Sequence, residues 1–309
     1  MSFFMRAQLA SLVSLFVALS LTAEAKVVAA PSAAEKLHQL FKEGKLYQAQ
    51  SEAVELLKQH PNDVPLLVEY GTILRSSGKP RQALQMFQRV VALQPQNVEA
   101  HVVISQLQLD NLDFKEALSS AIRAKNLDPA NLGARLAYVE ALLDTDKVND
   151  AERELQSMIG TGAANPEVLH LCYEVKVRKG DFNQASRYLE TAIALSQDPT
   201  AWQIELADLE QRMNHPDRAR QVLRTILTKN PFETEARLRL ARNLELFGGD
   251  FDGAIAEYRT LLEYDPDSAS ALTGIERCRA KKNNVALRIR TGLHGLAAEV
   301  GKFFSQWQH

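Results

Sequence analysis

The sequence predicts an all-α protein made of about seven stacked helix pairs, and three spacings predict it. An alanine recurs every 34 residues, with one interval of 35. A glycine stands five residues before four of these alanines, and a proline stands twelve residues after five of them. The alanines are Ala49, Ala83, Ala117, Ala151, Ala185, Ala219 and Ala254. A period of 34 residues is the length of a helix–turn–helix unit, and such units stack into one elongated domain.

The residues around each alanine predict where the two helices of a unit begin and end. The first helix is expected to end at a glycine, which adopts left-handed backbone easily. These glycines are Gly44, Gly78, Gly180 and Gly249. The alanine lets the two helices cross closely, and the proline stops the second helix. These prolines are Pro61, Pro95, Pro129, Pro231 and Pro266. Three aspartates are placed to cap the second helix, namely Asp113, Asp181 and Asp250.

Over residues 33–280 this pattern resembles the tetratricopeptide repeat (TPR) family. The second copy carries the resemblance best, with Tyr70-Gly71 in its first helix followed by Gly78, Ala83, Phe87 and Pro95. The resemblance implies a right-handed α-solenoid whose first helices line a concave face. It also implies a protein that holds partners and does not catalyse a reaction.

Two copies depart from the repeat pattern. The fourth ends in a glycine-rich joint at residues 160–166, with its proline three residues late, and we expect a possible bend there. The seventh carries one extra residue at Gly248-Gly249.

Residues 1–25 are predicted to be a signal peptide, and residues 26–32 a linker. One positive charge at Arg6 is followed by the apolar run from Leu9 to Leu21, and then by the small residues of Ala23-Glu24-Ala25. The run is short for a membrane span. We therefore expect a periplasmic or secreted protein after signal peptide cleavage. The alternative is an uncleaved inner-membrane anchor with the repeats facing the periplasm.

Charge and cysteine content narrow the class of protein further. The net charge is −2 with both signs mixed, so nucleic acid is not an expected partner. The two cysteines, Cys172 and Cys278, lie about three repeats apart and are expected to be buried, unlinked thiols.

Chemistry-bearing motifs are missing from the sequence. It contains no phosphate-binding loop, nucleophile elbow or H-E-x-x-H helix. His170 and Glu174 are four residues apart on one helical face, with Asp208 one repeat later, but a zinc site needs three or four close ligands. We interpret them as polar residues that line a wet groove. We expect a protein that is not an enzyme, with no cofactor and no metal.

The resemblance implies that a binding groove runs along the first helices. Its candidate residues form a mixed apolar and acidic middle and a basic carboxyl-terminal end. They are Val68, Glu69, Val103, Gln106, Leu136, Glu140, His170, Glu174, Glu205, Asp208, Arg239 and Arg242. One interpretation is a solvated face on which Asp208 and Arg242 pair across repeats. The other is a groove for an extended segment with apolar and basic side chains.

Residues 281–309 are predicted to form an amphipathic helix. Its apolar positions fall at three- and four-residue steps, and they are Leu293, Leu296, Val300, Phe303, Phe304 and Trp307. The favoured interpretation is a C-terminal capping helix, which solenoids require. Peripheral membrane contact or self-association are the alternatives.

These patterns together predict a non-catalytic scaffold in the bacterial cell envelope. It would bind a peptide segment or partner subunit in its groove, as part of an assembly, secretion or biofilm polysaccharide system. A periplasmic holding chaperone for exported clients is the alternative.

Overall fold

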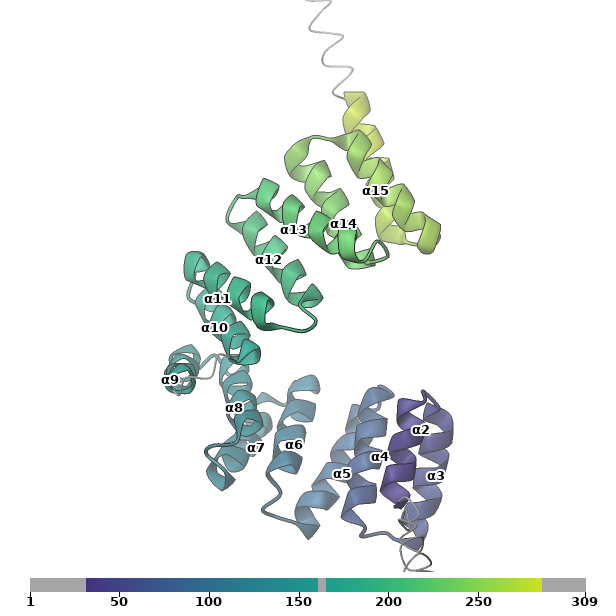
Figure 1. The fold of residues 1–309 in the computed structure, drawn as a ribbon, viewed down its shortest axis with the longest axis vertical. Coiled ribbons are helices and arrows are strands. Elements are labelled where there is room, and N and C mark those ends of the chain that lie inside the picture. Colours follow the sequence, from purple (N-terminus) through teal and green to yellow (C-terminus); the bar gives the residue numbers. More distant parts are fainter. Residues whose placement is uncertain (1–31, 161–164, 285–309) are drawn as a thin grey trace, which may run out of the picture. The chain divides into compact units, whose positions relative to one another are not determined.

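The computed structural model describes residues 32–160 and 165–284, and all regular structure within these ranges is helical (Figure 1). Seven helix pairs follow one another in the described residues. They are α2 (Ala33–Lys42) with α3 (Leu46–Gln59), α4 (Val64–Ser76) with α5 (Pro80–Leu93), α6 (Val98–Asp110) with α7 (Phe114–Leu127), α8 (Leu132–Asp144) with α9 (Val148–Ile159), α10 (Pro166–Arg178) with α11 (Phe182–Leu195), α12 (Thr200–Arg212) with α13 (Pro216–Lys229), and α14 (Thr234–Asn243) with α15 (Phe251–Tyr264). A further helix covers residues 269–284. The predicted all-α solenoid of helix pairs is confirmed.

The chain divides into two compact units, Met1–Pro129 and Ala130–His309. Among the described residues, unit 1 contains α2 to α7, and unit 2 contains α8 to α15 and the helix at 269–284. Each unit has a hydrophobic cluster of its own, one from Leu37 to Leu107 and one from Ala207 to Cys278. The sequence pattern did not predict this boundary, because the 34-residue period continues across it.

The repeated alanines lie in the second helix of each pair, and all seven are 0% exposed. A methyl group at this position lets the first helix approach closely, which any longer side chain would prevent. Gly71 serves the same purpose from the first helix of the second pair. A Cβ atom there would lie 2.7 Å from the ring of Phe87. Ala83, Gly71 and Phe87, which carried part of the family resemblance, are therefore packing residues between paired helices.

Between the two helices of every pair, one residue adopts left-handed backbone. The four predicted glycines have φ between 58° and 76°, and the equivalent positions in the other pairs hold Leu112 (φ 64°), Asp146 (φ 58°) and Asn214 (φ 64°). The turn is closed by two backbone bonds, as at Gly78, where Gly78 N donates to Arg75 O (3.1 Å) and Lys79 N to Leu74 O (2.9 Å). These bonds satisfy carbonyls at the end of the first helix, which would otherwise have no partner.

The predicted aspartate caps are confirmed at two of three positions. The carboxylates of Asp181 and Asp250 accept hydrogen bonds from Gln184 N (3.1 Å) and Gly253 N (2.9 Å). Asp113 occupies the same position before α7, but its side chain makes no capping bond. The sequence reasoning also missed the caps of the first helices. Asp63, Asn97, Asn131 and Asn165 each accept from the backbone nitrogen three residues later.

The extra residue of the seventh copy is absorbed by a π-helical turn. This turn, η1 (Leu244–Gly248), continues α14, and Gly249 then ends it with φ 58°. Asp250 N donates to Leu244 O (3.2 Å), one residue further back than in the other pairs. Since a π-turn accommodates one inserted residue, the second helix of this pair keeps its register and Ala254 stays buried.

Several predicted segments lie outside the described residues. These are the signal peptide (1–25), all of the 26–32 linker except Ser32, and the apolar positions of the C-terminal segment between 285 and 309. The helix at 269–284 runs through residue 280, where the sequence placed the end of the solenoid. The bend near 160–166 remains a prediction, because residues 161–164 are also outside the described ranges. In the described ranges, no helix has the length and apolarity that a membrane crossing requires.

Candidate functional site

The predicted groove residues fall into the two units, and each set is considered within its own unit. Unit 1 holds Val68 and Glu69 on α4 and Val103 and Gln106 on α6. The two valines are half-buried against the hydrophobic cluster of this unit. Glu69 Oε1 lies 3.0 Å from His38 Nδ1, and Gln106 Oε1 accepts from Arg75 Nη1 at 3.0 Å. Glu69 and Gln106 therefore each have a partner on the preceding first helix.

The other eight predicted residues lie in unit 2, on four successive first helices. Leu136 and Glu140 are half-buried on α8, and the two arginines, Arg239 and the exposed Arg242, belong to α14. His170 and Glu174 lie on α10, while Glu205 and Asp208 lie on α12. The structure brings His170, Glu174 and Glu205 into one connected group, whereas Asp208 pairs with Arg239 of α14.

His170 is at the centre of this group. Its imidazole ring stacks on the indole of Trp202, with centroids 5.0 Å apart and an interplanar angle of 14°. The Tyr173 ring is tilted by 43° relative to the imidazole, with the two centroids 5.4 Å apart. Both ring nitrogens face carboxylates, because Nε2 lies 2.7 Å from Glu205 Oε2 and Nδ1 lies 3.6 Å from Glu174 Oε1. We call His170, Tyr173, Glu174, Trp202 and Glu205 the aromatic–acidic patch.

Burial and charge in this patch affect its titrating groups. Burial raises the pKa of Glu174, while the charges of His170 and Arg178 oppose that increase. Burial and the nearby Glu205 and Glu174 carboxylates raise the pKa of Tyr173 to about 12. The phenol is thus a neutral hydrogen-bonding group at physiological pH, and it does not act as a base there.

Asp208 does not pair with Arg242, so the predicted partner was wrong, although Asp208 does pair with an arginine of the next repeat. Instead, Arg239 Nε donates to both carboxylate oxygens of Asp208 at 2.9 Å, and Arg239 also pairs with Glu235. Residues 31 positions apart meet here, as they do in the pairs His38–Glu69 and Arg75–Gln106. A long side chain reaches forward or back to the neighbouring repeat, which a strict 34-residue track does not take into account.

Tyr173 and Trp202 were missed by the sequence reasoning. Trp202 is the third residue of α12, and the third residues of the other first helices in unit 2 are Ala134, Val168 and Ala236, all buried. Trp202 is only partly buried. The replacement of a small core residue by a tryptophan at one repeat was the signal available in the sequence.

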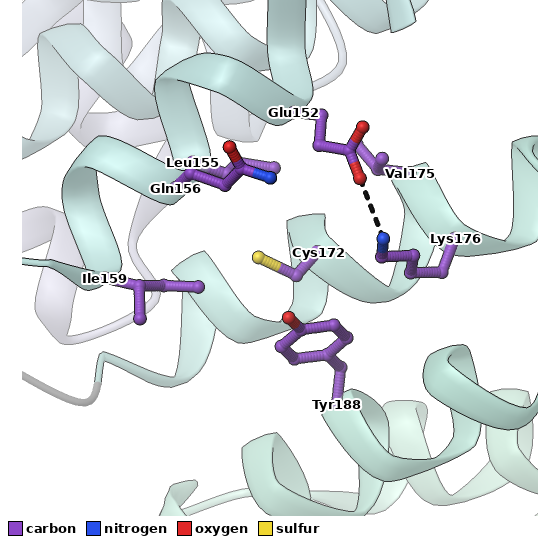
Figure 2. A pocket seen from close by; sticks show the side chains of 8 residues that line it. All are labelled: Glu152, Leu155, Gln156, Ile159, Cys172, Val175, Lys176 and Tyr188. Carbon is purple, nitrogen blue, oxygen red and sulfur yellow. Dashed lines mark hydrogen bonds and ion pairs between the residues drawn. The ribbon is translucent and has the colours of Figure 1, made fainter. Parts of the chain in front are cut away.

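A small cavity opens between α9, α10 and α11, next to the glycine-rich joint (Figure 2). Its volume is about 30 Å³, and Cys172 points into it from α10, with Leu155 and Ile159 of α9 opposite and Tyr188 of α11 beside it. At the rim, Glu152 bridges Lys176 (2.7 Å) and Lys179 (2.5 Å), which lowers the pKa of the carboxyl. This volume is enough for about one water molecule, so the cavity is a packing defect and not a ligand site.

Both cysteines are free and buried, as predicted. Burial raises the pKa of the Cys172 thiol to about 11, so neither deprotonation nor nucleophilic chemistry is favoured at this position. Within residues 32–160 and 165–284, no three His, Cys, Asp or Glu residues are grouped so that they could hold a metal ion.

Comparison with known proteins gives three family models described as tetratricopeptide repeat. They match residues 68–131, 176–244 and 235–268, together about half of the chain. The chain belongs to the tetratricopeptide repeat family. TPR arrays are typically non-catalytic, and this TPR protein is accordingly a scaffold for protein–protein interaction.

Several solved structures resemble the fold at low sequence identity. A TPR protein from Parabacteroides merdae has a TM-score of 0.62 and 14% identity, covering 80% of this chain and 97% of that chain. The Cut9–Hcn1 hetero-tetramer of the APC/C gives 0.59 and 18%, covering 81% and 49%. Yeast Tom70 gives 0.56 and 19%, covering 80% and 60%. These similarities support the fold alone.

One curated relative is similar in sequence. Cellulose synthase 1 operon protein C of Komagataeibacter xylinus is 29% identical over 174 residues. The match covers 52% of this chain and 13% of that protein, so the chain spans only a small part of the relative's length.

Proposed function

We propose that this TPR protein is a non-catalytic scaffold of the bacterial cell envelope that holds an extended segment of a partner subunit on the first-helix face of unit 2. The observation that carries the proposal is the aromatic–acidic patch. Its polar and aromatic side chains lie on successive first helices and remain partly exposed. Side chains needed only for stacking repeats would be buried like the seven alanines.

A role in polysaccharide secretion is the pathway we favour. The relative from K. xylinus is named for a cellulose synthase operon, and the leader-like residues 1–25 favour export to the periplasm. Mass analysis of the mature protein, together with cell fractionation, tests this part of the proposal. A chain that keeps its first 25 residues in the cytoplasm would contradict it.

Photo-crosslinking in cells tests the proposed binding face. A photoreactive amino acid replaces Gln203 or Arg242 on the first helices of unit 2, and Arg187 or Arg224 on the second helices serves as the matched control. We expect one discrete adduct from the first-helix positions and none from the controls. Adducts with many unrelated exported proteins would instead support a holding chaperone. Equal labelling from both faces would contradict a first-helix binding site.

A further inference from the structure

The aromatic–acidic patch holds more negative charge than its own neighbours neutralise. In the described part of the chain, the ion pairs of Glu174 and Glu205 both go to His170, which carries at most one positive charge. The arginines around the patch contact other groups. Arg212, whose charge acts on Tyr173, lies over the Phe182 ring, 4.7 Å from its centroid. Arg178 donates to Leu143 O (2.9 Å) and Asp144 (3.4 Å), and Arg239 binds Asp208 and Glu235. Among the described residues, Glu174 and Glu205 therefore share one histidine as their ion-pair partner, and at least one carboxylate charge is left without an ion pair of its own.

The exposure of an aromatic ring in the patch is a second observation, independent of the charge. The indole of Trp202 occupies a position that is buried and smaller in the other first helices of unit 2, yet it stays partly exposed against His170. The side chains of Glu174 and Glu205 are 35% and 38% exposed, so incoming groups can reach both. Core packing explains neither the tryptophan nor the carboxylates.

An arginine side chain has the chemistry that this surface lacks. Its guanidinium is planar, stacks on aromatic faces and binds carboxylates with two parallel hydrogen bonds. A lysine ammonium could satisfy the charge, but it offers no flat surface to an indole. We propose that the patch is an anchoring site for one arginine side chain of the bound segment, an inference that rests on the proposed use of this face for binding a partner.

Short synthetic peptides test this recognition directly. The chain has two tryptophans, Trp202 and Trp307, so Trp307→Phe leaves Trp202 as the single tryptophan that reports binding by fluorescence. The probes are acetylated, amidated heptapeptides with leucines on either side of a central arginine, lysine or citrulline, which is the neutral isostere of arginine. We expect the arginine peptide to bind about tenfold or more tightly than the citrulline peptide, with weaker binding at high salt.

Isosteric variants connect the binding to the patch. Glu174→Gln with Glu205→Gln is expected to remove most of the preference for arginine over citrulline. The matched control is Glu190→Gln, on the second-helix face, where the carboxylate pairs with Arg218 at 3.1 Å. Because Trp202→Ala could disturb folding, the carboxylate variants are the decisive ones. Equal affinity for arginine and citrulline, equal affinity for lysine and arginine, or an unchanged preference in the double variant would each overturn the proposal.

Failure of this inference differs from failure of the proposed function. If the double variant still yields the first-helix crosslinked adduct and shows no arginine preference, the face binds its partner by other contacts and only the arginine anchor is wrong. If the peptides show the arginine preference but no adduct forms in cells, the anchor stands and the scaffold role on this face is wrong.

Discussion

At the scale of single residues, left-handed turn positions show where the repeat pattern is imperfect. The position is glycine in four pairs, but it is Leu112 in the third. A side chain with a Cβ atom in this conformation costs about 1–2 kcal/mol, less for asparagine or aspartate. Leu112 is 71% exposed, so its side chain recovers little of that cost by burial.

Leu112→Gly is therefore expected to stabilise unit 1 by about 1 kcal/mol. Urea unfolding followed by circular dichroism measures the change. Asn214→Gly is the matched comparison at the equivalent turn of α12 and α13, and it should give a smaller gain because asparagine tolerates this conformation. A loss of stability in Leu112→Gly would show that the exposed leucine makes contacts that outweigh its backbone strain.

The two thiols give a second prediction at this scale. Since burial raises the pKa of Cys172 to about 11 and also raises that of Cys278, both thiols should react very slowly with Ellman's reagent in the native protein at neutral pH. After denaturation without reductant, two thiols per chain should titrate. A denatured monomer with no free thiol would contradict both the buried placement and the repeat register.

At the scale of elements, the last described helix is tied to the π-turn by one buried carboxylate. Glu245 Oε1 and Oε2 accept from Arg277 (3.1 and 2.9 Å), Lys281 donates to Oε1 at 2.9 Å, and the Tyr258 hydroxyl donates to Oε2 at 3.2 Å. The hydrogen bonds from Arg277 and Lys281 lower the pKa of Glu245 to about 2. The inserted residue of the seventh copy thus lies next to a group of ion pairs that joins η1 to the helix at 269–284.

Glu245→Gln is expected to lower the free energy of unfolding at pH 7 by on the order of 2 kcal/mol. The folded-state pKa lies below the ordinary value of 4.5, so this stabilisation is present above about pH 4.5 and is lost as the pH falls toward 2. Urea unfolding of both proteins between pH 7 and about pH 3 should show the difference shrinking with acid. If the difference in free energy of unfolding stays constant with pH, the charge of the Glu245 carboxylate does not stabilise the contact between η1 and the helix at 269–284.

At the scale of the whole molecule, the continuous repeat is divided into two compact units with separate hydrophobic clusters. In repeat proteins, stability is approximately a sum of terms within units and between neighbours. The residues of each cluster all come from one unit. We therefore expect each unit to stay folded without the other.

A fragment of residues 130–309 is therefore expected to be helical and to unfold cooperatively by itself. Circular dichroism during heating checks this. The control fragment begins at residue 214, which separates α12 from α13 within one pair and removes Ala207 from the cluster of unit 2. That fragment should have less helix per residue and a broader transition. If the two fragments have the same helix content per residue and equally sharp transitions, the boundary at Pro129 does not mark a unit that folds independently.

The sequence by itself determined the helix pairs, the buried alanines, the turn positions and the family, because these depend on local spacing that recurs in every copy. Its groove candidates all lie on the first helices of their pairs, since the first-helix register follows from the same period. It also found His170 and Glu174 as neighbours, because four-residue spacing on one helix is a local property.

Only the tertiary structure decided which side chains from different repeats meet. Asp208 pairs with Arg239 and not with Arg242, His170 stacks on Trp202, and Glu245 receives Arg277 and Lys281. These contacts span 31 to 36 residues, because long side chains reach forward or back from their own backbone positions. The offset depends on side-chain length and on how closely neighbouring helices pack, and neither is visible in a spacing of 34.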